Sequence, residues 1–127
     1  QLDSEESGME KVYCCFASNA KDFARFGKLY KNHGKWNSQV LLDSTFIQKA
    51  INPVFEKSPY YGYGWWLYEF ENKKVYSMRG HRGQFVIVIP EDDLIIVRLG
   101  NYVTRGEGDE FKGDFYNYIA ETYKMLN

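Results

Sequence analysis

The sequence predicts one α+β domain in which a small antiparallel sheet packs against helices. Two observations indicate this fold class. Apolar residues recur at the i, i+3, i+4 spacing of an amphipathic helix in three segments, and four runs rich in aromatic and β-branched residues stand together before the last of them. A chain of 127 residues usually forms one domain with a buried core. We therefore expect residues 1–127 to be a single domain, with the last helix laid on the sheet.

The chain is expected to begin with a loop or a cut end over residues 1–13, since the first ten residues are polar and acidic and the first is Gln1 rather than Met. The first helix follows, because Ser18 is a good N-cap and Gly34 supplies a C-terminal stop. Its inner face is predicted to carry Ala20, Phe23, Ala24, Gly27 and Tyr30.

A second, shorter helix is predicted after a cap at Asp43 or Ser44. Its apolar positions are Phe46, Ile47, Ala50 and Ile51. The helix must end near Pro53, because the residue before a proline disfavours the α region.

Two β-hairpins are predicted next. The aromatic stretch 63–70 passes through a polar turn into the run 75–80. The runs 85–89 and 94–99 are joined by a tight acidic turn. Since residues 85–89 and 94–99 are almost continuously apolar, these strands are expected to be buried on both faces.

The final helix is predicted to start at a cap formed by Asp114. Its inner stripe is expected to contain Phe115, Tyr118, Ile119, Thr122 and Met125 or Leu126. The two cysteines, Cys14 and Cys15, are adjacent, so their Cα atoms are about 3.8 Å apart across a trans peptide. This is below the ~4.4 Å usual for disulfides, and no bridge is expected.

The composition excludes several classes of function. The 16 basic and 17 acidic residues nearly cancel, and no basic cluster is long enough to follow a phosphate backbone, so no nucleic-acid partner is expected. The longest apolar run is residues 85–89, far below the roughly 20 residues of a membrane span. With only two histidines and neither an HExxH nor a Cys-x-x-Cys motif, no metal site and no cofactor are expected.

Three segments, in this order, carry a family likeness: CCFASNAKDFARFGKLYKNHGKWN, YGYGWW and GHRGQFVIVIPEDDLIIVRLGN. Together they resemble the C-terminal half of the serine β-lactamase-like superfamily, and most closely its class C β-lactamase, penicillin-binding and esterase-like serine hydrolases. The similarity spans roughly residues 14–100. It implies the C-terminal part of the β-lactamase/transpeptidase-like fold, an acyl-enzyme mechanism, and a periplasmic or cell-envelope setting.

That family carries its chemistry on a Ser-x-x-Lys at a helix start, a Tyr-x-Asn on a loop, and a Lys-Thr-Gly or His-x-Gly on a strand beside the cleft. His81-Arg82-Gly83 matches the third element. The resemblance therefore implies His81 and Gln84 as catalytic residues, with the backbone N–H of Gln84 completing the oxyanion hole. Arg82 and Gly83 are the implied substrate-binding residues.

Each of these residue types has a physical reason. Gly83 has no Cβ, so a substrate can approach the main chain closely. A fixed backbone N–H such as that of Gln84 is worth a few kcal/mol when it faces a developing oxyanion. His81 can donate a hydrogen bond or carry charge near neutral pH. A structural interpretation stays open, in which the element is only a turn between strands and Gly80 and Gly83 supply unusual backbone angles.

Two earlier motifs imitate the rest of the family set: Ser18-Asn19-Ala20-Lys21 fits Ser-x-x-Lys, and Tyr30-Lys31-Asn32 fits Tyr-x-Asn. If Ser18 caps the helix that contains Tyr30, twelve residues at 1.5 Å each separate them by roughly 18 Å. Two groups so far apart cannot serve one reacting carbonyl. We therefore interpret Ser18 as a helix cap and expect the chain to lack the nucleophile.

Two functional hypotheses follow. In the first, the chain is the C-terminal fragment of a serine hydrolase, inactive alone, whose parent acts on a small-molecule, peptide or ester substrate. In the second, it is a non-catalytic aromatic-rich module that binds glycan or peptide through the run 60–66, although core packing is the favoured role of those rings. The isolated chain is expected to self-associate if a sheet edge and an apolar face lose their cover.

Overall fold

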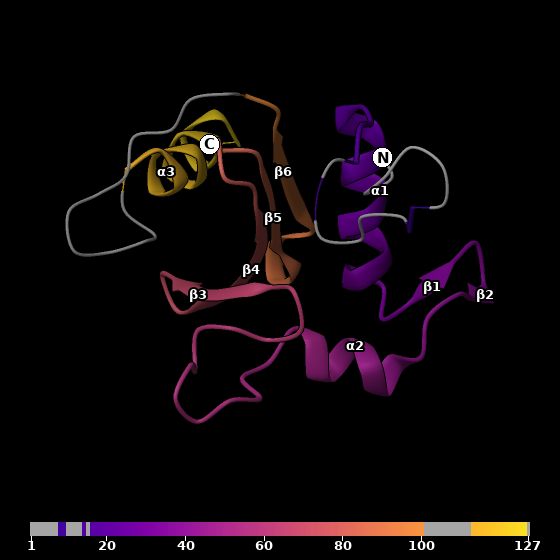
Figure 1. Cartoon of the computed structure of the whole chain (residues 1–127). Coiled ribbons are helices and arrows are strands. Elements are labelled where there is room, and N and C mark those ends of the chain that lie inside the picture. The colour runs from indigo at the N-terminus through magenta and orange to yellow at the C-terminus, as the bar shows by residue number, and fades with distance from the viewer. Residues whose placement is uncertain (1–7, 10–13, 15, 101–112, 127) are drawn as a thin grey trace.

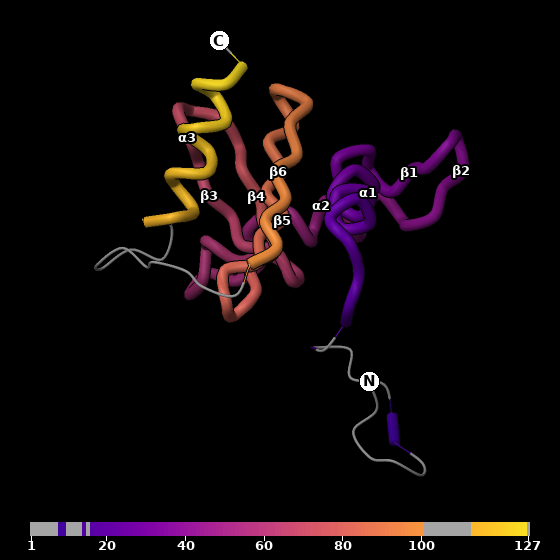
Figure 2. The backbone as a smooth tube through the Cα atoms, turned by 90° about the horizontal axis from the view of Figure 1, so that it is seen from above, coloured from indigo at the N-terminus to yellow at the C-terminus, as the bar shows by residue number. Residues whose placement is uncertain are grey.

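The structure, a computed structural model, describes residues 8–9, 14, 16–100 and 113–126. A four-stranded antiparallel sheet lies between helix α1 (Ala20–Lys31) on one face and helix α3 (Asp114–Leu126) on the other (Figure 1). Figure 2, turned by 90°, shows the two helices on opposite sides of the strands. The predicted α+β class, a small antiparallel sheet packed with helices, is confirmed. The expected loop over residues 1–13 falls almost wholly outside the described residues.

The sheet follows the order of the chain, so each neighbouring pair of strands is a hairpin. Its strands are β3 (Trp66–Phe70), β4 (Lys73–Arg79), β5 (Phe85–Ile89) and β6 (Leu94–Arg98). Glu71 and Asn72 form the β3–β4 turn with φ of 50° and 63°, the left-handed pair typical of a two-residue hairpin. Both predicted hairpins are confirmed, although β3 begins three residues later than the aromatic run suggested.

Strand β5 is the centre of the molecule, and all five of its residues are buried. Val86 and Val88 face α1 in a cluster with Tyr30, Ile47 and Trp65. The alternate positions face α3 in a second cluster that contains Phe85, Ile87, Ile89, Phe115 and Ile119. The expectation of burial on both faces is confirmed for β5, and it explains why this run shows no alternation of apolar and polar residues. It is wrong for the run 94–99, because all residues of β6 are half-buried and Leu99 is exposed.

Helix α1 begins one residue later than predicted, because Asn19 and not Ser18 is the N-cap. The Asn19 side chain accepts a hydrogen bond from the N–H of Asp22 at 3.1 Å. The Ser18 hydroxyl instead donates to the Asp22 carboxylate at 2.8 Å. Gly27 lets the helix approach the sheet closely, since a Cβ there would lie 3.1 Å from Val86 Cγ1 and 3.2 Å from Val88 Cγ2.

Between α1 and β3 the chain forms a small hairpin and a short helix. The hairpin of β1 (Lys35–Trp36) and β2 (Gln39–Val40) was not expected from the sequence. Helix α2 (Ser44–Ala50) confirms the second predicted helix, and Asp43 is its cap, accepting from the N–H of Phe46 at 2.9 Å. A 3-10 turn, η1 (Pro90–Asp92), joins β5 to β6.

Two expectations are wrong in detail. Met125 and Leu126 are exposed, so the inner stripe of α3 ends earlier than predicted and consists of Phe115 and Ile119 with half-buried neighbours. Cys14 is disulfide-bonded, contrary to expectation, and Cys15 lies outside the described residues. That expectation rested on the usual Cα separation of bridged cysteines, which is a survey range and not a strict limit.

Candidate active site

The Gly-His-Arg-Gly-Gln segment is the loop of the β4–β5 hairpin, which we call the 80–84 loop. Its ends are joined by a bond from the N–H of Gly80 to the carbonyl of Gln84 at 2.7 Å. A second bond, from the N–H of Gly83 to the carbonyl of Gly80 at 3.0 Å, closes a tight turn over His81 and Arg82. Gly83 has φ of +81°, the left-handed conformation that favours glycine. The structure therefore places the His-x-Gly element in a turn at the sheet end, where strand pairing has stopped.

The four candidate site residues have different environments within this loop. His81 and Arg82 are exposed, Gly83 is buried and Gln84 is half-buried. Within the described residues, the His81 imidazole makes no hydrogen bond and no ion pair. The loop thus brings the four residues together and leaves the His81 ring free to contact another group.

Gln84 is held by its side chain. Its Nε2 donates to the Gly100 carbonyl, and its Oε1 accepts from the N–H of Arg82 at 3.3 Å. Gly80 makes room for this amide, because a Cβ at that position would lie 2.4 Å from Gln84 Oε1. Among the described hydrogen bonds of the loop, the Gln84 carbonyl and side chain are used and its backbone N–H is not.

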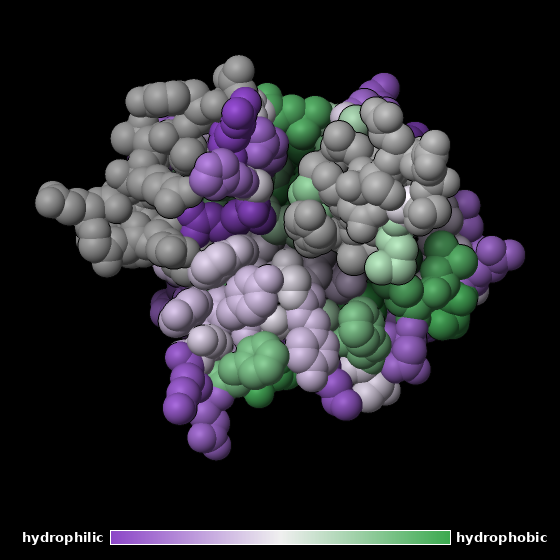
Figure 3. All heavy atoms as spheres, viewed as in Figure 1, coloured by the Kyte–Doolittle hydropathy of each residue, from purple (hydrophilic) through white to green (hydrophobic). Residues whose placement is uncertain are grey.

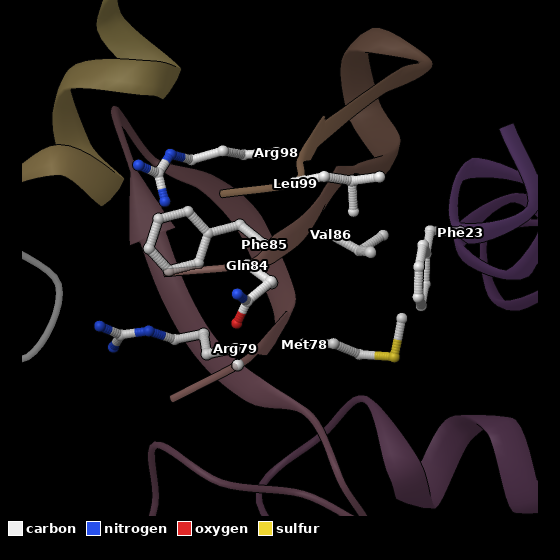
Figure 4. Close-up of a pocket in the computed structure, with 9 residues that line it drawn as sticks. Phe23, Met78, Arg79, Gln84, Phe85, Val86, Arg98 and Leu99 are labelled. Atoms are coloured by element: carbon white, nitrogen blue, oxygen red, sulfur yellow. The ribbon is translucent and has the colours of Figure 1, made fainter. Parts of the chain in front are cut away.

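A cleft of about 220 Å³ lies beside this loop, between α1 and the end of the sheet. Figure 4 shows Phe23 of α1 facing Met78, Val86 and Leu99 across it, with Gln84 between them and the arginines. The side chains of Arg79 and Arg98 extend the other way, toward α3 (Figure 4). The cleft therefore has an apolar wall on the α1 side and a polar margin formed by the 80–84 loop.

Arg79 belongs to an aromatic cluster and not to the apolar wall. Its guanidinium lies over the rings of Phe115 at 5.2 Å and Trp66 at 5.6 Å from their centroids. These cation–π contacts hold the end of β4 against α3. The geometry therefore gives the Arg79 side chain a packing role.

The early Ser-x-x-Lys and Tyr-x-Asn motifs lie along α1. The Ser18 hydroxyl is bonded to Asp22 before the first turn, and this bond, with the Arg25 contacts, holds the pKa of the Asp22 carboxyl below its usual range. Tyr30, near the other end of the helix, is buried against Trp65 at 4.7 Å between ring centroids. Lys31 pairs with Asp93. The two motifs therefore occupy opposite ends of one helix, as their spacing predicted.

A second polar cluster lies at the other end of the sheet. Lys73 Nζ and Asp92 Oδ2 are 2.6 Å apart, the Tyr123 hydroxyl donates to the same carboxylate, and the Lys73 ammonium lies 4.8 Å from the Tyr123 ring centroid. The hydrogen bond to Lys73, followed by that to Tyr123, keeps the pKa of Asp92 low. These contacts tie the end of α3 to the strands, away from the 80–84 loop.

The aromatic run 60–66 is divided between core and surface. Trp65 is 2% exposed and packs edge-on against Tyr76 at 5.1 Å. Tyr60 and Tyr63 remain 50% and 43% exposed. The favoured core role therefore holds for Trp65 and not for the whole run.

The described part of the chain contains no group of three or more His, Cys, Asp or Glu side chains that could hold a metal ion. None of its helices is long and apolar enough to cross a bilayer.

Comparisons with known proteins identify a matching family and a similar solved structure. A family model described as Beta-lactamase matches residues 15–121. Among solved structures, a Bacillus anthracis protein assigned as a 6-aminohexanoate-dimer hydrolase is similar, with a TM-score of 0.60 and 21% sequence identity. That match covers 84% of this chain and 28% of the hydrolase chain, so this chain spans little more than a quarter of its length. No curated protein matches.

Proposed function

Because the chain belongs to the Beta-lactamase family, we propose that its 80–84 loop forms one wall of a serine hydrolase active site. The observation that carries this proposal is the hydrogen bonding of Gln84. Its side-chain amide is tied to Gly100 and Arg82, while its backbone N–H takes no part in the described hydrogen bonds of the loop. A donor held in this way at a cleft needs little reorganisation when an oxyanion forms.

In the proposed reaction, a serine hydroxyl attacks the substrate carbonyl and loses its proton to a base. The carbonyl π electrons move onto oxygen, and the backbone N–H of Gln84 stabilises that charge. Collapse of the intermediate expels the leaving group, which takes the proton from the base, and gives the acyl-enzyme. Water then loses a proton to the base and attacks the acyl carbon, which releases the acid and restores the serine hydroxyl. His81, which is exposed in the 80–84 loop, orients the substrate by hydrogen bonding, and Arg82 attracts an anionic part of it.

The serine and its base come, in this proposal, from a segment outside these 127 residues. Ser18 is bonded to Asp22 at the start of α1, and Tyr30 is buried in the core. The short span relative to the Bacillus anthracis hydrolase supports the proposal that residues 1–127 are part of a longer domain.

The cleft favours a substrate with a compact apolar group next to the reacting carbonyl. Its α1 side consists of Phe23, Met78, Val86 and Leu99, and its volume of about 220 Å³ suits a small side chain or ring. An ester or amide of a small carboxylic acid, or a peptide with an apolar residue at this position, has this chemistry.

The reading frame that encodes the chain provides the first test. We expect it to encode a Ser-x-x-Lys helix upstream of Gln1, and a frame without one would remove the first hypothesis. The isolated chain is expected to hydrolyse neither p-nitrophenyl esters nor nitrocefin. Clear turnover that Ser18→Ala abolishes would show instead that the nucleophile is within the chain.

A second candidate function rests on exposed aromatic rings. Phe46, Phe55, Tyr60 and Tyr63 are all more than 40% exposed. The Phe46 and Tyr63 rings lie 6.2 Å apart, and those of Phe55 and Tyr63 lie 6.1 Å apart. Figure 3 shows pale and green side chains gathered on the lower part of the molecule, where α2 and the segment before β3 lie in Figure 1.

Flat exposed rings of this kind can stack on sugars or on peptide side chains. A titration with oligosaccharides, followed by tryptophan fluorescence through Trp66 beside Tyr60, tests the binding-module hypothesis. Saturable quenching that Tyr60→Ala removes would support it, and a flat response would count against it.

A further inference from the structure

Arg98 contacts the backbone of the 80–84 loop from the neighbouring strand. Its Nη1 donates a hydrogen bond to the carbonyl of Gly83, fifteen residues earlier in the chain. Arg98 is the last residue of β6 and pairs with Phe85 of β5, so its side chain reaches back past the start of β5 to the loop. None of the sequence motifs includes this contact, because it joins two strands through a side chain.

The guanidinium of Arg98 is fixed on several sides. Its Nε donates to the Tyr118 hydroxyl of α3 at 2.8 Å. Its Cζ lies 5.4 Å from the Tyr118 ring centroid and 5.9 Å from that of Phe85. Gly100 leaves the space that the group occupies, since a Cβ there would lie 2.8 Å from Arg98 Cζ and Nη1. A side chain held in this way can define the position of the carbonyl it binds.

The carbonyl of Gly83 and the N–H of Gln84 belong to one peptide unit. The described chain contains no cis peptide, so this unit is planar and trans, and its C=O and N–H point in opposite directions. The guanidinium that binds the carbonyl extends toward α3, whereas the cleft lies on the α1 side (Figure 4). A bond that fixes the carbonyl toward α3 therefore fixes the N–H away from α3.

We propose that Arg98, held by Tyr118, is a positioning residue that keeps the Gly83–Gln84 peptide turned with its N–H toward the cleft. This inference rests on the proposed function, in which that N–H is the oxyanion donor. Arg98 also polarises the peptide, because a charged donor on the carbonyl strengthens the N–H as a donor through the same unit. The bonds from Arg98 to Tyr118 and to Gly83 thus connect helix α3 to the active-site wall.

Nuclear magnetic resonance of the isotope-labelled 127-residue chain tests this position without any catalysis. A hydrogen bond to a carbonyl deshields its carbon and the nitrogen of the next residue. Arg98→Lys keeps the charge but loses the second bonding nitrogen of the fork. We expect it to move the Gly83 carbonyl carbon and the Gln84 nitrogen upfield by more than any other signals of the loop, with the rest of the spectrum retained.

Tyr118→Phe removes one hydroxyl and keeps the ring, so it provides a milder variant that folds even if Arg98→Lys does not. It is expected to give smaller shifts in the same direction. Tyr116→Phe is the matched control, since that ring is on the same helix and exposed. If Arg98→Lys folds and leaves both signals at their wild-type positions, the proposal is wrong. If Arg98→Lys unfolds, coincidence of the Tyr118→Phe and Tyr116→Phe spectra at both signals overturns it.

A kinetic experiment on the protein encoded by the whole reading frame separates this inference from the proposed function. Arg98→Lys is expected to lower kcat and to leave KM little changed. The decrease in kcat should be smaller than the roughly 100- to 1,000-fold loss that follows deletion of an oxyanion donor. A protein without any hydrolase activity would contradict the proposed function and leave the resonance result standing. An active protein with unchanged kcat in Arg98→Lys would contradict the positioning role alone.

Discussion

The backbone conformation of Gly83 determines the shape of the 80–84 loop. Its φ of +81° is in the left-handed region, where any side chain is strained, and its N–H closes the turn onto Gly80 at 3.0 Å. We expect Gly83→Ala to lower the free energy of unfolding by roughly 1–2 kcal/mol, as measured by urea denaturation.

Gly64 provides the matched control for this substitution. Its φ is +80°, and a Cβ there would meet nothing within 4 Å, so Gly64→Ala carries the same backbone strain without any contact. The two variants should be destabilised alike, but only Gly83→Ala should shift the amide signal of Gln84. Unchanged stability in Gly83→Ala would show that the loop has a different backbone conformation.

Several site features at this scale could be read from the sequence, and others could not. The glycines of Gly-His-Arg-Gly kept a turn open as the alternative to a strand wall, because a turn of this kind needs a residue that tolerates positive φ. The contact between Arg98 and Gly83 could not be predicted, since it depends on strand register and on the space beside Gly100. The cap of α1 was misplaced by one residue because Ser18 and Asn19 both suit that position.

At the scale of single elements, the cap of α2 gives a pH-dependent prediction. The N–H of Phe46 bonds to the Asp43 carboxylate and holds the pKa of Asp43 below its usual range. Since the folded-state pKa is lower than the unfolded value of about 3.9, the stabilisation is complete above that value and is lost as pH falls through the folded pKa. Asp43→Ala should therefore lower Tm at pH 7, and the difference from wild type should narrow below about pH 4.

Asp43→Asn is the control for this prediction, because its amide oxygen can still accept the bond from Phe46 but does not titrate in this range. Its Tm should stay close to that of wild type at pH 7. A difference between Asp43→Ala and wild type that remained constant down to pH 2 would contradict the assignment of Asp43 as a charged cap.

The elements themselves were largely predictable, because their signals are local. The run Phe85–Ile89 is continuously apolar, and this predicted a strand that is buried on both faces. The structure places α1 on one of these faces and α3 on the other. The hairpin of β1 and β2 was not predicted, because its strands are two residues long and too short to show an alternation of apolar and polar residues. Its turn, Asn37 and Ser38 at φ of 45° and 68°, was the one local signal available.

At the scale of the whole molecule, one face of α1 exposes apolar side chains. Phe26, Leu29, Trp36 and Leu41 line a groove of about 510 Å³ between α1 and the β1–β2 hairpin. Val40 beside it is 67% exposed. We expect the isolated chain to self-associate through this face at micromolar concentration, because burying it would remove apolar area from water.

Sedimentation velocity measures this association directly. Leu41→Glu should weaken it by placing a charge in the groove, and Gln39→Glu, which adds the same charge on the exposed β2, should have less effect. A sedimentation profile containing only monomer across the micromolar range would rule out association.

The family assignment was available from the sequence because three separate segments carried it, and the match over residues 15–121 agrees with that reading. The roles of His81, Arg82, Gly83 and Gln84 remain proposals, since a catalytic site is defined by groups that meet in space. The four residues share the 80–84 loop, and Gln84 among them lines the cleft beside Phe23. The nucleophile that would complete the site lies, in our proposal, on another segment.

The acylation burst of the protein encoded by the whole reading frame tests the central claim most directly. With p-nitrophenyl acetate, we expect a rapid release of about one equivalent of p-nitrophenol from wild type and from Gly64→Ala. Gly83→Ala should slow the burst on the order of 100-fold, because the turned peptide no longer presents the Gln84 N–H to the oxyanion. A Gly83→Ala burst at the wild-type rate, or no burst in the wild-type protein, would contradict the assignment of this loop as an oxyanion wall.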